Sequence, residues 1–226
     1  MNKKAIHHVE YAIAVSIFII AVMFVLYFSH FTSRDVGDRS LDYLEKAFRE
    51  KTETSVMKVS VVTGGCNSGC NISLNSNLPT STNHLVILEN GVPIKFKLEN
   101  NFLYFKGDST NYQLVESEDL NYTPNFPDYY LPSDYNYSLP YEGRLVSSKK
   151  LAGLNYNYSS EYNTLKQEFG LDKDFSIEIK NVNGTKLFDM SMGIPPGIQV
   201  YAKEFRIRMI NSTAEEFEAI VILKTW

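Results

Sequence analysis

The longest apolar run of the chain lies close to its N-terminus. The eighteen residues from Tyr11 to Phe28 contain one clearly polar side chain, Ser16. A helix of this length is about 27 Å long, close to the hydrocarbon thickness of a bilayer. The pattern predicts a membrane-spanning helix over residues 6–31.

Two lysines set the expected orientation of this helix. Lys3 and Lys4 precede the apolar run, and the positive-inside rule then leaves the short N-terminus in the cytoplasm. A secretory signal peptide is the competing interpretation, but the run is long and no small-x-small cleavage site follows it. We therefore expect a single-pass protein of the cell membrane with its remaining residues on the cell surface.

The pattern after the apolar run changes to an amphipathic one. Leu41, Leu44 and Phe48 recur at i, i+3 and i+7 with charged residues between them, which is typical of a helix with one buried face. This predicts a helical stem over residues 32–56. Gly37 is expected to mark a bend or break between the two helical segments.

From residue 57 the hydrophobic period becomes two, which predicts a β-rich head over residues 57–226. Residues 84–107 read as a three-strand meander with turns at 89–91 and 99–101. A short helix is predicted over 159–170, ending at Gly170.

The last third of the chain continues this pattern. The pair Asn183-Gly184 predicts one hairpin, and residues 212–216 predict another. The fold class expected for the whole chain is therefore α+β: a long N-terminal helix, an amphipathic stem and a mostly antiparallel head.

One long segment of the head fits no regular element. Residues 119–141 contain four prolines and six tyrosines, which disfavours helix and strand over most of their length. A loop of this length within a compact domain is usually functional or disordered. Its composition resembles that of binding loops, so these tyrosines are candidates for a recognition loop, unless they pack the loop onto the head: Tyr122, Tyr129, Tyr130, Tyr135, Tyr137 and Tyr141.

Composition supports a packed domain and argues against nucleic acid as a partner. The chain is 44% hydrophobic and 21% charged, with a formal net charge of −4, which is enough for a core. No basic cluster follows the first four residues, so the electrostatic footprint of a nucleic-acid-binding protein is absent from the sequence.

Two further features agree with an extracytoplasmic head. Cys66 and Cys70 stand in one glycine-rich turn and predict a structural disulfide. A reactive thiol would need a neighbouring base, and a zinc site would need two more ligands, which the four scattered histidines do not offer. Six N-x-[ST] sequons are candidate glycosylation sites, at Asn71, Asn121, Asn136, Asn157, Asn183 and Asn211.

The sequence carries no signature of catalysis. The G-x-S-x-G, H-E-x-x-H, P-loop and G-x-G-x-x-G patterns do not occur. Ser147 to Lys150 formally matches S-x-x-K, but its companion motifs are missing. We expect no enzyme activity, no cofactor and no metal, and an anchored hydrolase is the weakest of three functional hypotheses.

Glu10 is the most informative residue for the function of the chain, because burying an unpaired carboxylate in a membrane helix costs free energy. One interpretation makes Glu10 a solvated interface residue beside Lys3 and Lys4. If the chain were cut between Ala5 and Ile6, however, Glu10 would be the fifth residue of the mature protein. With "KKA" before the cut, "IHHVE" after it and an apolar helix beyond, the sequence resembles precursors of the type IV pilin superfamily in their archaeal form.

The resemblance implies a division of the chain and a set of partners. Residues 1–5 would be a class III leader removed by a prepilin peptidase, and Glu10 would neutralise the new N-terminal amine of a neighbouring subunit. The chain would then be a subunit, a minor one, of a type IV pilus-like or pseudopilus-like filament. The alternative is a lone anchored surface protein whose Tyr-rich loop binds glycan or protein.

Overall fold

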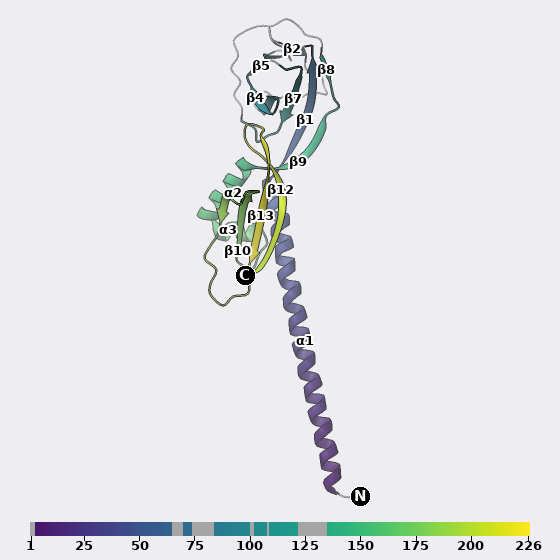
Figure 1. Cartoon of the computed structure of the whole chain (residues 1–226). Coiled ribbons are helices and arrows are strands. Elements are labelled where there is room, and N and C mark those ends of the chain that lie inside the picture. Colours follow the sequence, from purple (N-terminus) through teal and green to yellow (C-terminus); the bar gives the residue numbers. More distant parts are fainter. Residues whose placement is uncertain (1–2, 65–69, 74–83, 100–101, 108, 122–134) are drawn as a thin grey trace.

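The structure, a computed structural model, describes residues 3–64, 70–73, 84–99, 102–107, 109–121 and 135–226. In the first helix, α1, the side chains of residues 3–13 and 28–38 are outside this description. A long helix carries a head of two lobes at its C-terminal end, and its N-terminal half projects away from the head (Figure 1).

Helix α1 runs without interruption from Lys3 to Thr52. The bend expected at Gly37 is absent, since a helical glycine costs only about 1 kcal/mol and no proline occurs within these fifty residues. The predicted amphipathic stripe is confirmed, because Leu41, Leu44 and Phe48 are all buried. The helix ends four residues earlier than expected, at Thr52, whose hydroxyl donates to the Phe48 carbonyl at 2.6 Å.

Within the described part of the chain, no helix has both the length and the apolar character that crossing a membrane requires. The span predicted over residues 6–31 includes two groups, 6–13 and 28–31, whose side chains lie outside the description.

The lower lobe packs three helices on one face of an antiparallel sheet. Its strand order is β11-β10-β13-β12. The strands are β10 (Phe175–Asn181), β11 (Lys186–Met190), β12 (Tyr201–Ile210) and β13 (Glu216–Thr225). Helices α2 (Ser148–Ser160) and α3 (Tyr162–Glu168) share one hydrophobic core with the C-terminal half of α1 and this sheet.

The upper lobe is formed by two sheets packed around a second core. The larger sheet contains β1 (Glu53–Thr63), β3 (Leu85–Glu89), β4 (Val92–Ile94), β7 (Asn111–Glu116), β8 (Tyr135–Tyr137) and β9 (Tyr141–Ser147). The smaller sheet has the order β2-β6-β5 and is built from β2 (Cys70–Ser73), β5 (Phe96–Glu99) and β6 (Phe102–Phe105).

A short parallel contact joins the two lobes into one ten-stranded sheet. Strand β12 pairs with β9 only at Met209↔Val146 and Ile210↔Ser147. Every other strand pair in the described residues is antiparallel. The α+β class and the mostly antiparallel head are therefore confirmed.

Strand β1 changes its buried face as it passes from one lobe to the other. Thr54 and Val56 are buried close to the start of the strand, whereas Val59 and Val61 are buried further along it. Two residues two positions apart share a face of a strand and residues three apart do not. The strand therefore contributes to two cores, one on each side of the sheet.

Several local predictions can be compared with this fold. The turn at Asn90-Gly91 and the hairpin at Asn183-Gly184 are confirmed, with positive φ at Asn90, Gly91 and Gly184. The predicted three-strand meander is wrong, because its middle strand divides at Lys95 into β4 and β5, which belong to different sheets. Helix α2 was not predicted at all, and the helix predicted over 159–170 begins only at Tyr162, as α3, because Ser159 and Ser160 belong to the end of α2.

Candidate functional site

In the N-terminal half of α1, the described side chains, from residue 14 to residue 27, are mostly apolar and are exposed on every side. The four consecutive residues 17–20 are 62%, 69%, 55% and 67% exposed. Successive helical residues point about 100° apart, so these four side chains sample the whole circumference. All described side chains from residue 14 to residue 27 are exposed in the same way, and the head covers none of this half (Figure 1).

Such a surface is unfavourable in water. Fully burying one large apolar side chain contributes about 1.5–3 kcal/mol, and eleven large apolar side chains between Val15 and Tyr27 stand exposed. A helix that is hydrophobic all round is typically buried, either in protein or in lipid. This half of α1 is the strongest candidate for the functional surface of the chain.

The C-terminal half of α1 is fixed to the head by a charged network. Lys203 on β12 lies 2.8 Å from both Asp42 Oδ1 and Glu45 Oε2. The Arg49 guanidinium donates from Nε to Glu45 Oε1 at 2.9 Å, and lies 4.9 Å from the centre of the Phe205 ring. These contacts hold the helix against β12 over two turns.

The network shifts the pKa values of Glu45 and Lys203. Burial raises the pKa of the Glu45 carboxyl, but hydrogen bonds from Lys203 and Arg49 outweigh it, so this pKa lies below its ordinary value. Hydrogen bonds to Asp42 and Glu45 raise the pKa of Lys203. Glu45 and Lys203 are therefore both charged at neutral pH, so the ion pair between them is formed there.

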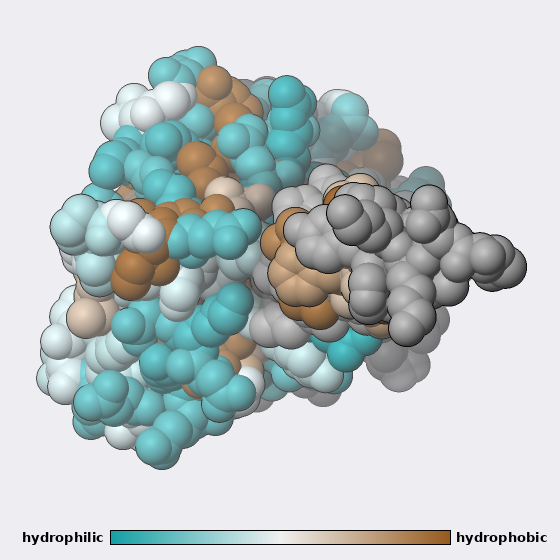
Figure 2. Space-filling model, turned by 90° about the horizontal axis from the view of Figure 1, so that it is seen from below, coloured by the Kyte–Doolittle hydropathy of each residue, from teal (hydrophilic) through white to brown (hydrophobic). Residues whose placement is uncertain are grey.

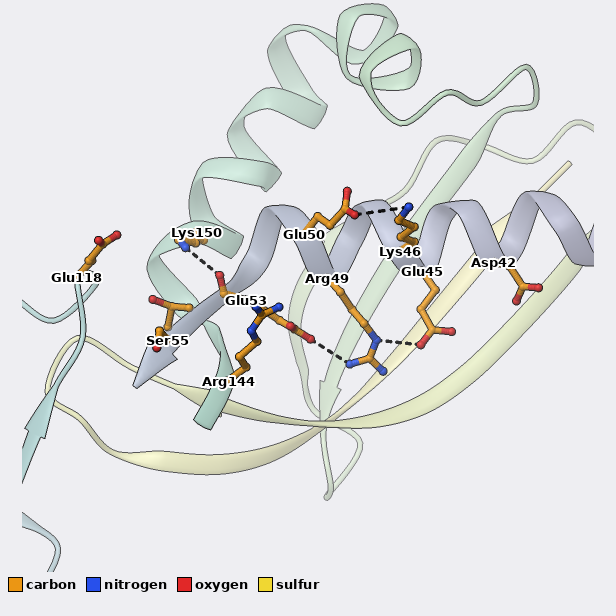
Figure 3. A pocket seen from close by; sticks show the side chains of 11 residues that line it. Asp42, Glu45, Lys46, Arg49, Glu50, Glu53, Ser55, Glu118, Arg144 and Lys150 are labelled. Carbon is orange, nitrogen blue, oxygen red and sulfur yellow. Dashed lines mark hydrogen bonds and ion pairs between the residues drawn. The ribbon is translucent and has the colours of Figure 1, made fainter. Parts of the chain in front are cut away.

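A hollow of about 640 Å³ lies beside this network, between the last turns of α1, β1 and β9 (Figure 3). Its lining is almost entirely charged, and several of its groups are paired: Lys46 with Glu50 at 3.8 Å, and Arg49 Nη1 with Glu53 Oε1 at 3.2 Å. The chain carried a signal for these pairs, since Glu45, Arg49 and Glu53 are spaced by four. We interpret the hollow as part of the joint between helix and head.

The predicted processing site and Glu10 are placed only by their backbone. Ala5, Ile6 and Glu10 belong to α1, which begins at Lys3, and their side chains are outside the description. Cleavage after Ala5 and the charge-neutralising role of Glu10 stay predictions.

Cys70 is fully buried in β2, opposite Phe105 of β6. It is not a free cysteine. Its expected partner, Cys66, lies outside the described residues, so the pairing of these two residues stays a prediction.

The six sequons differ in how accessible they are. Four asparagines are exposed, at Asn121, Asn136, Asn157 and Asn183. Asn71 is half-buried, and its Oδ1 is buried without a hydrogen-bond partner among the described residues. Asn211 is engaged at both ends of its amide, as Nδ2 donates to Glu215 and Oδ1 accepts from the Glu215 backbone.

The Tyr-rich segment is described only in its last part. Tyr122, Tyr129 and Tyr130 lie outside the described residues. Tyr135 packs against the upper core and donates to the Ser73 carbonyl at 2.7 Å, with its ring stacked near that of Tyr137. Tyr137 and Tyr141 are exposed on the upper lobe, together with Leu139.

The described residues hold no arrangement that indicates catalysis or metal binding. No group of three or more His, Cys, Asp or Glu side chains in this part of the chain could hold a metal ion. The S-x-x-K match has a structural role, because the buried Ser147 hydroxyl caps α2 by accepting from the Lys150 backbone at 3.3 Å.

Comparison of the chain with protein-family models, with curated proteins and with solved structures finds no match.

Proposed function

We propose that this chain is a pilin-like subunit, a minor one, of a type IV pilus-like or pseudopilus-like filament at the cell surface. Before assembly, the N-terminal half of α1 would anchor it in the cell membrane, with the head outside. The resemblance of residues 1 to about 56, the apolar helix and its stem, to pilin precursors supports this proposal, as does the expectation of an oxidised cysteine pair in the head.

The observation that carries the proposal is that the two halves of α1 have different surroundings. One unbroken helix buries Leu44 and Phe48 in the head and presents an apolar, exposed surface through its other half. A subunit that moves from lipid into a helical bundle needs this combination: a rigid connection to the head, and an apolar rod that either environment can cover. The head, about 170 residues in two lobes, is large for a repeating filament unit, which favours a minor subunit.

Glu10 would give assembly its register. After cleavage at Ala5–Ile6, the new amine of one subunit and the Glu10 carboxylate of its neighbour would be desolvated together, where opposite charges attract strongly. Removing one partner would leave an uncompensated charge in a low-dielectric environment, a loss of about 3–5 kcal/mol.

Three variants test this role. Glu10→Ala and Glu10→Gln remove the charge and should abolish cross-linking and co-purification with other pilin-like subunits, whereas Glu10→Asp keeps the carboxylate and should retain most of it. Head folding, followed by circular dichroism, should be the same in all three. Assembly of Glu10→Ala at the wild-type level would contradict the proposal.

The N-terminus provides an independent test. Mass spectrometry of protein extracted from membranes should find a chain that begins at Ile6. A chain that keeps residues 1–5 would remove the main support for a pilin-like precursor, because cleavage creates the amine that Glu10 is proposed to neutralise.

A second candidate function is supported by the upper lobe. Tyr137, Leu139 and Tyr141 alternate along the chain and are exposed on the upper lobe, the lobe farther from the N-terminal end of α1 (Figure 1). A lone anchored protein could use them to bind glycan or protein, because aromatic side chains provide rigid contact area. This candidate predicts that Tyr141→Ala abolishes binding to a glycan array or surface extract, while Glu10→Ala leaves it unchanged.

A further inference from the structure

The loop between β11 and β12 is an unusual part of the head surface. Residues 191–200 contain no charged side chain, although 21% of the chain is charged. All ten residues are exposed. Four of them are large and apolar, with exposed fractions of 46%, 42%, 47% and 38% for Met192, Ile194, Ile198 and Val200.

This loop lies at the end of the head that faces the N-terminal half of α1 (Figure 1). The sheet register gives the same position, because Tyr201, which follows the loop, pairs with Thr225 beside the C-terminus. Seen from this end, along α1, the head is largely hydrophilic with separate hydrophobic patches (Figure 2). The apolar loop is therefore on the side from which the anchor leaves.

The loop is held in a defined shape. Pro195 and Pro196 restrict the backbone at its tip, and Gly197 follows with φ of +81°. At its start, the Met192 backbone hydrogen-bonds to the Tyr158 hydroxyl, and the Ser191 side chain hydrogen-bonds to Asp189. A constrained loop loses little conformational entropy when its side chains are covered.

Residues of the kind found at membrane interfaces surround it. The Lys173 ammonium lies 4.8 Å from the centre of the Tyr201 ring, and the half-buried Trp226 directly follows the neighbouring strand β13. Tyr, Trp and Lys are the residues that proteins place at the level of lipid headgroups, where an apolar body and a polar tip are both satisfied.

The distances allow this loop to reach a membrane that α1 crosses. From Phe28, the end of the apolar run, α1 rises about 20 Å to Leu41, where the head begins. A ten-residue loop that leaves and rejoins one sheet end can extend about 16 Å, and the headgroup layer adds about 5–7 Å beyond the hydrocarbon. A typical helix tilt of about 20° would lower one side of the head further.

We propose that loop 191–200 inserts Ile194 and Ile198 into the outer headgroup layer of the membrane that anchors the chain. This inference rests on the proposed function, because it requires α1 to cross the bilayer. The loop gives the unassembled subunit a second membrane contact, which fixes the tilt of the head. The same apolar residues become available to a neighbouring head once the subunit leaves the membrane.

The test uses the full chain in vesicles of phosphatidylcholine with a minority of phosphatidylglycerol, at large lipid excess. Trp226 is the only tryptophan, so Trp226→Phe provides a silent background for single tryptophan probes. Ile194→Trp reports the loop. Val182→Trp is the matched control, because Val182 is 55% exposed but follows Asn181, at the other end of the same sheet. Phe18→Trp reports the span itself.

Lipids brominated close to the headgroup should quench Ile194→Trp roughly twofold or more and leave Val182→Trp unaffected. Equal emission from these two probes would overturn the inference, provided that lipids brominated near the ends of their acyl chains quench Phe18→Trp, which lies near the bilayer centre in the proposed span. Failure of these deeply brominated lipids to quench Phe18→Trp would instead contradict the proposed membrane anchor. A change at Ile194→Trp that follows protein density rather than bromination would assign the loop to contact with another copy, and would also overturn the inference.

Discussion

Lys203 Nζ lies 2.8 Å from Glu45 Oε2 and connects the first strand residues after the apolar loop to the helix that carries the head. The Glu45 side chain is shared, because Arg49 binds its other oxygen at 2.9 Å. In the proposed filament, any force on α1 would reach the head through this network and through the packing of Phe48 against Phe205, whose ring centres are 6.4 Å apart. The joint is therefore where mutations should separate the stability of the head from its assembly.

Arg49→Ala should destabilise the head by about 1–2 kcal/mol, because the guanidinium bridges two carboxylates and covers the Phe205 ring. Lys46→Ala is the matched control on the same helix. Lys46 pairs with Glu50 at 3.8 Å with both side chains largely exposed, and its loss should cost less than about 0.5 kcal/mol. Urea unfolding of the full chain in detergent micelles measures both, and equal effects would show that the network does not secure the joint.

Two phenylalanines of one helix should behave in opposite ways. Phe48 is fully buried in the lower core, so Phe48→Ala should lower the free energy of unfolding by about 3–5 kcal/mol. Phe18 is 69% exposed, so Phe18→Ala should leave head stability within about 0.5 kcal/mol of the wild type. Chemical unfolding followed by near-ultraviolet circular dichroism makes this comparison. A comparable loss for Phe18→Ala would mean that the N-terminal half of α1 packs on the head.

Much of the fold followed from local signals in the sequence. The spacing of Leu41, Leu44 and Phe48 specifies the buried face of α1. Asn-Gly pairs specify turns because the glycine tolerates positive φ, as does the asparagine at Asn90. Helix α2 carried a similar signal in Leu151, Leu154 and Tyr158, which are buried at i, i+3 and i+7. Its Asn-, Tyr- and Ser-rich composition has low helix propensity, which concealed the period.

Long-range features could not be predicted in this way. The union of the lobes depends on two residue pairs between β12 and β9, and no local pattern encodes which strands meet. In the sequence, the change of buried face in β1 interrupts the alternation of hydrophobic and polar residues. Only the two cores on opposite sides of the sheet explain this interruption. The apolar residues of loop 191–200 follow neither a strand period nor a helix period. Their proposed role in membrane contact could be inferred only from the position of the loop at the end of the head.

The head should lose stability at high pH in a way that depends on Tyr162. Burial raises the pKa of this hydroxyl to about 12, where it donates to Asp174 Oδ1 and accepts from the Phe175 backbone, both at 3.1 Å. A folded-state pKa above the unfolded value of about 10 contributes stability that is complete below pH 10 and is lost as the pH rises through 12. The alkaline slope of unfolding free energy should therefore be shallower in Tyr162→Phe.

Tyr156→Phe is the control for this titration, because Tyr156 is largely exposed on α2. It should keep the wild-type slope between pH 10 and pH 12, measured by urea unfolding at a series of pH values. If Tyr162→Phe and Tyr156→Phe gave the same slope, the half-buried Tyr162 hydroxyl would not be the group whose ionisation destabilises the lower lobe.

The sequons should differ in occupancy if the folded head is glycosylated. Asn157 and Asn183 are exposed, and their side chains can reach a modifying enzyme. The Asn211 Oδ1 accepts from the Thr213 backbone, the Thr213 hydroxyl and the Glu215 backbone at 2.9–3.0 Å, so modification there requires the β12–β13 turn to open. Glycopeptide mass spectrometry of the native chain should find Asn157 and Asn183 occupied and Asn211 empty.

Asn211→Ala should cost about 1–2 kcal/mol of head stability through loss of the turn, whereas Asn183→Gln should remove a glycan with little effect on folding. Equal occupancy at Asn211 and Asn183 would mean that glycans are added before this turn forms.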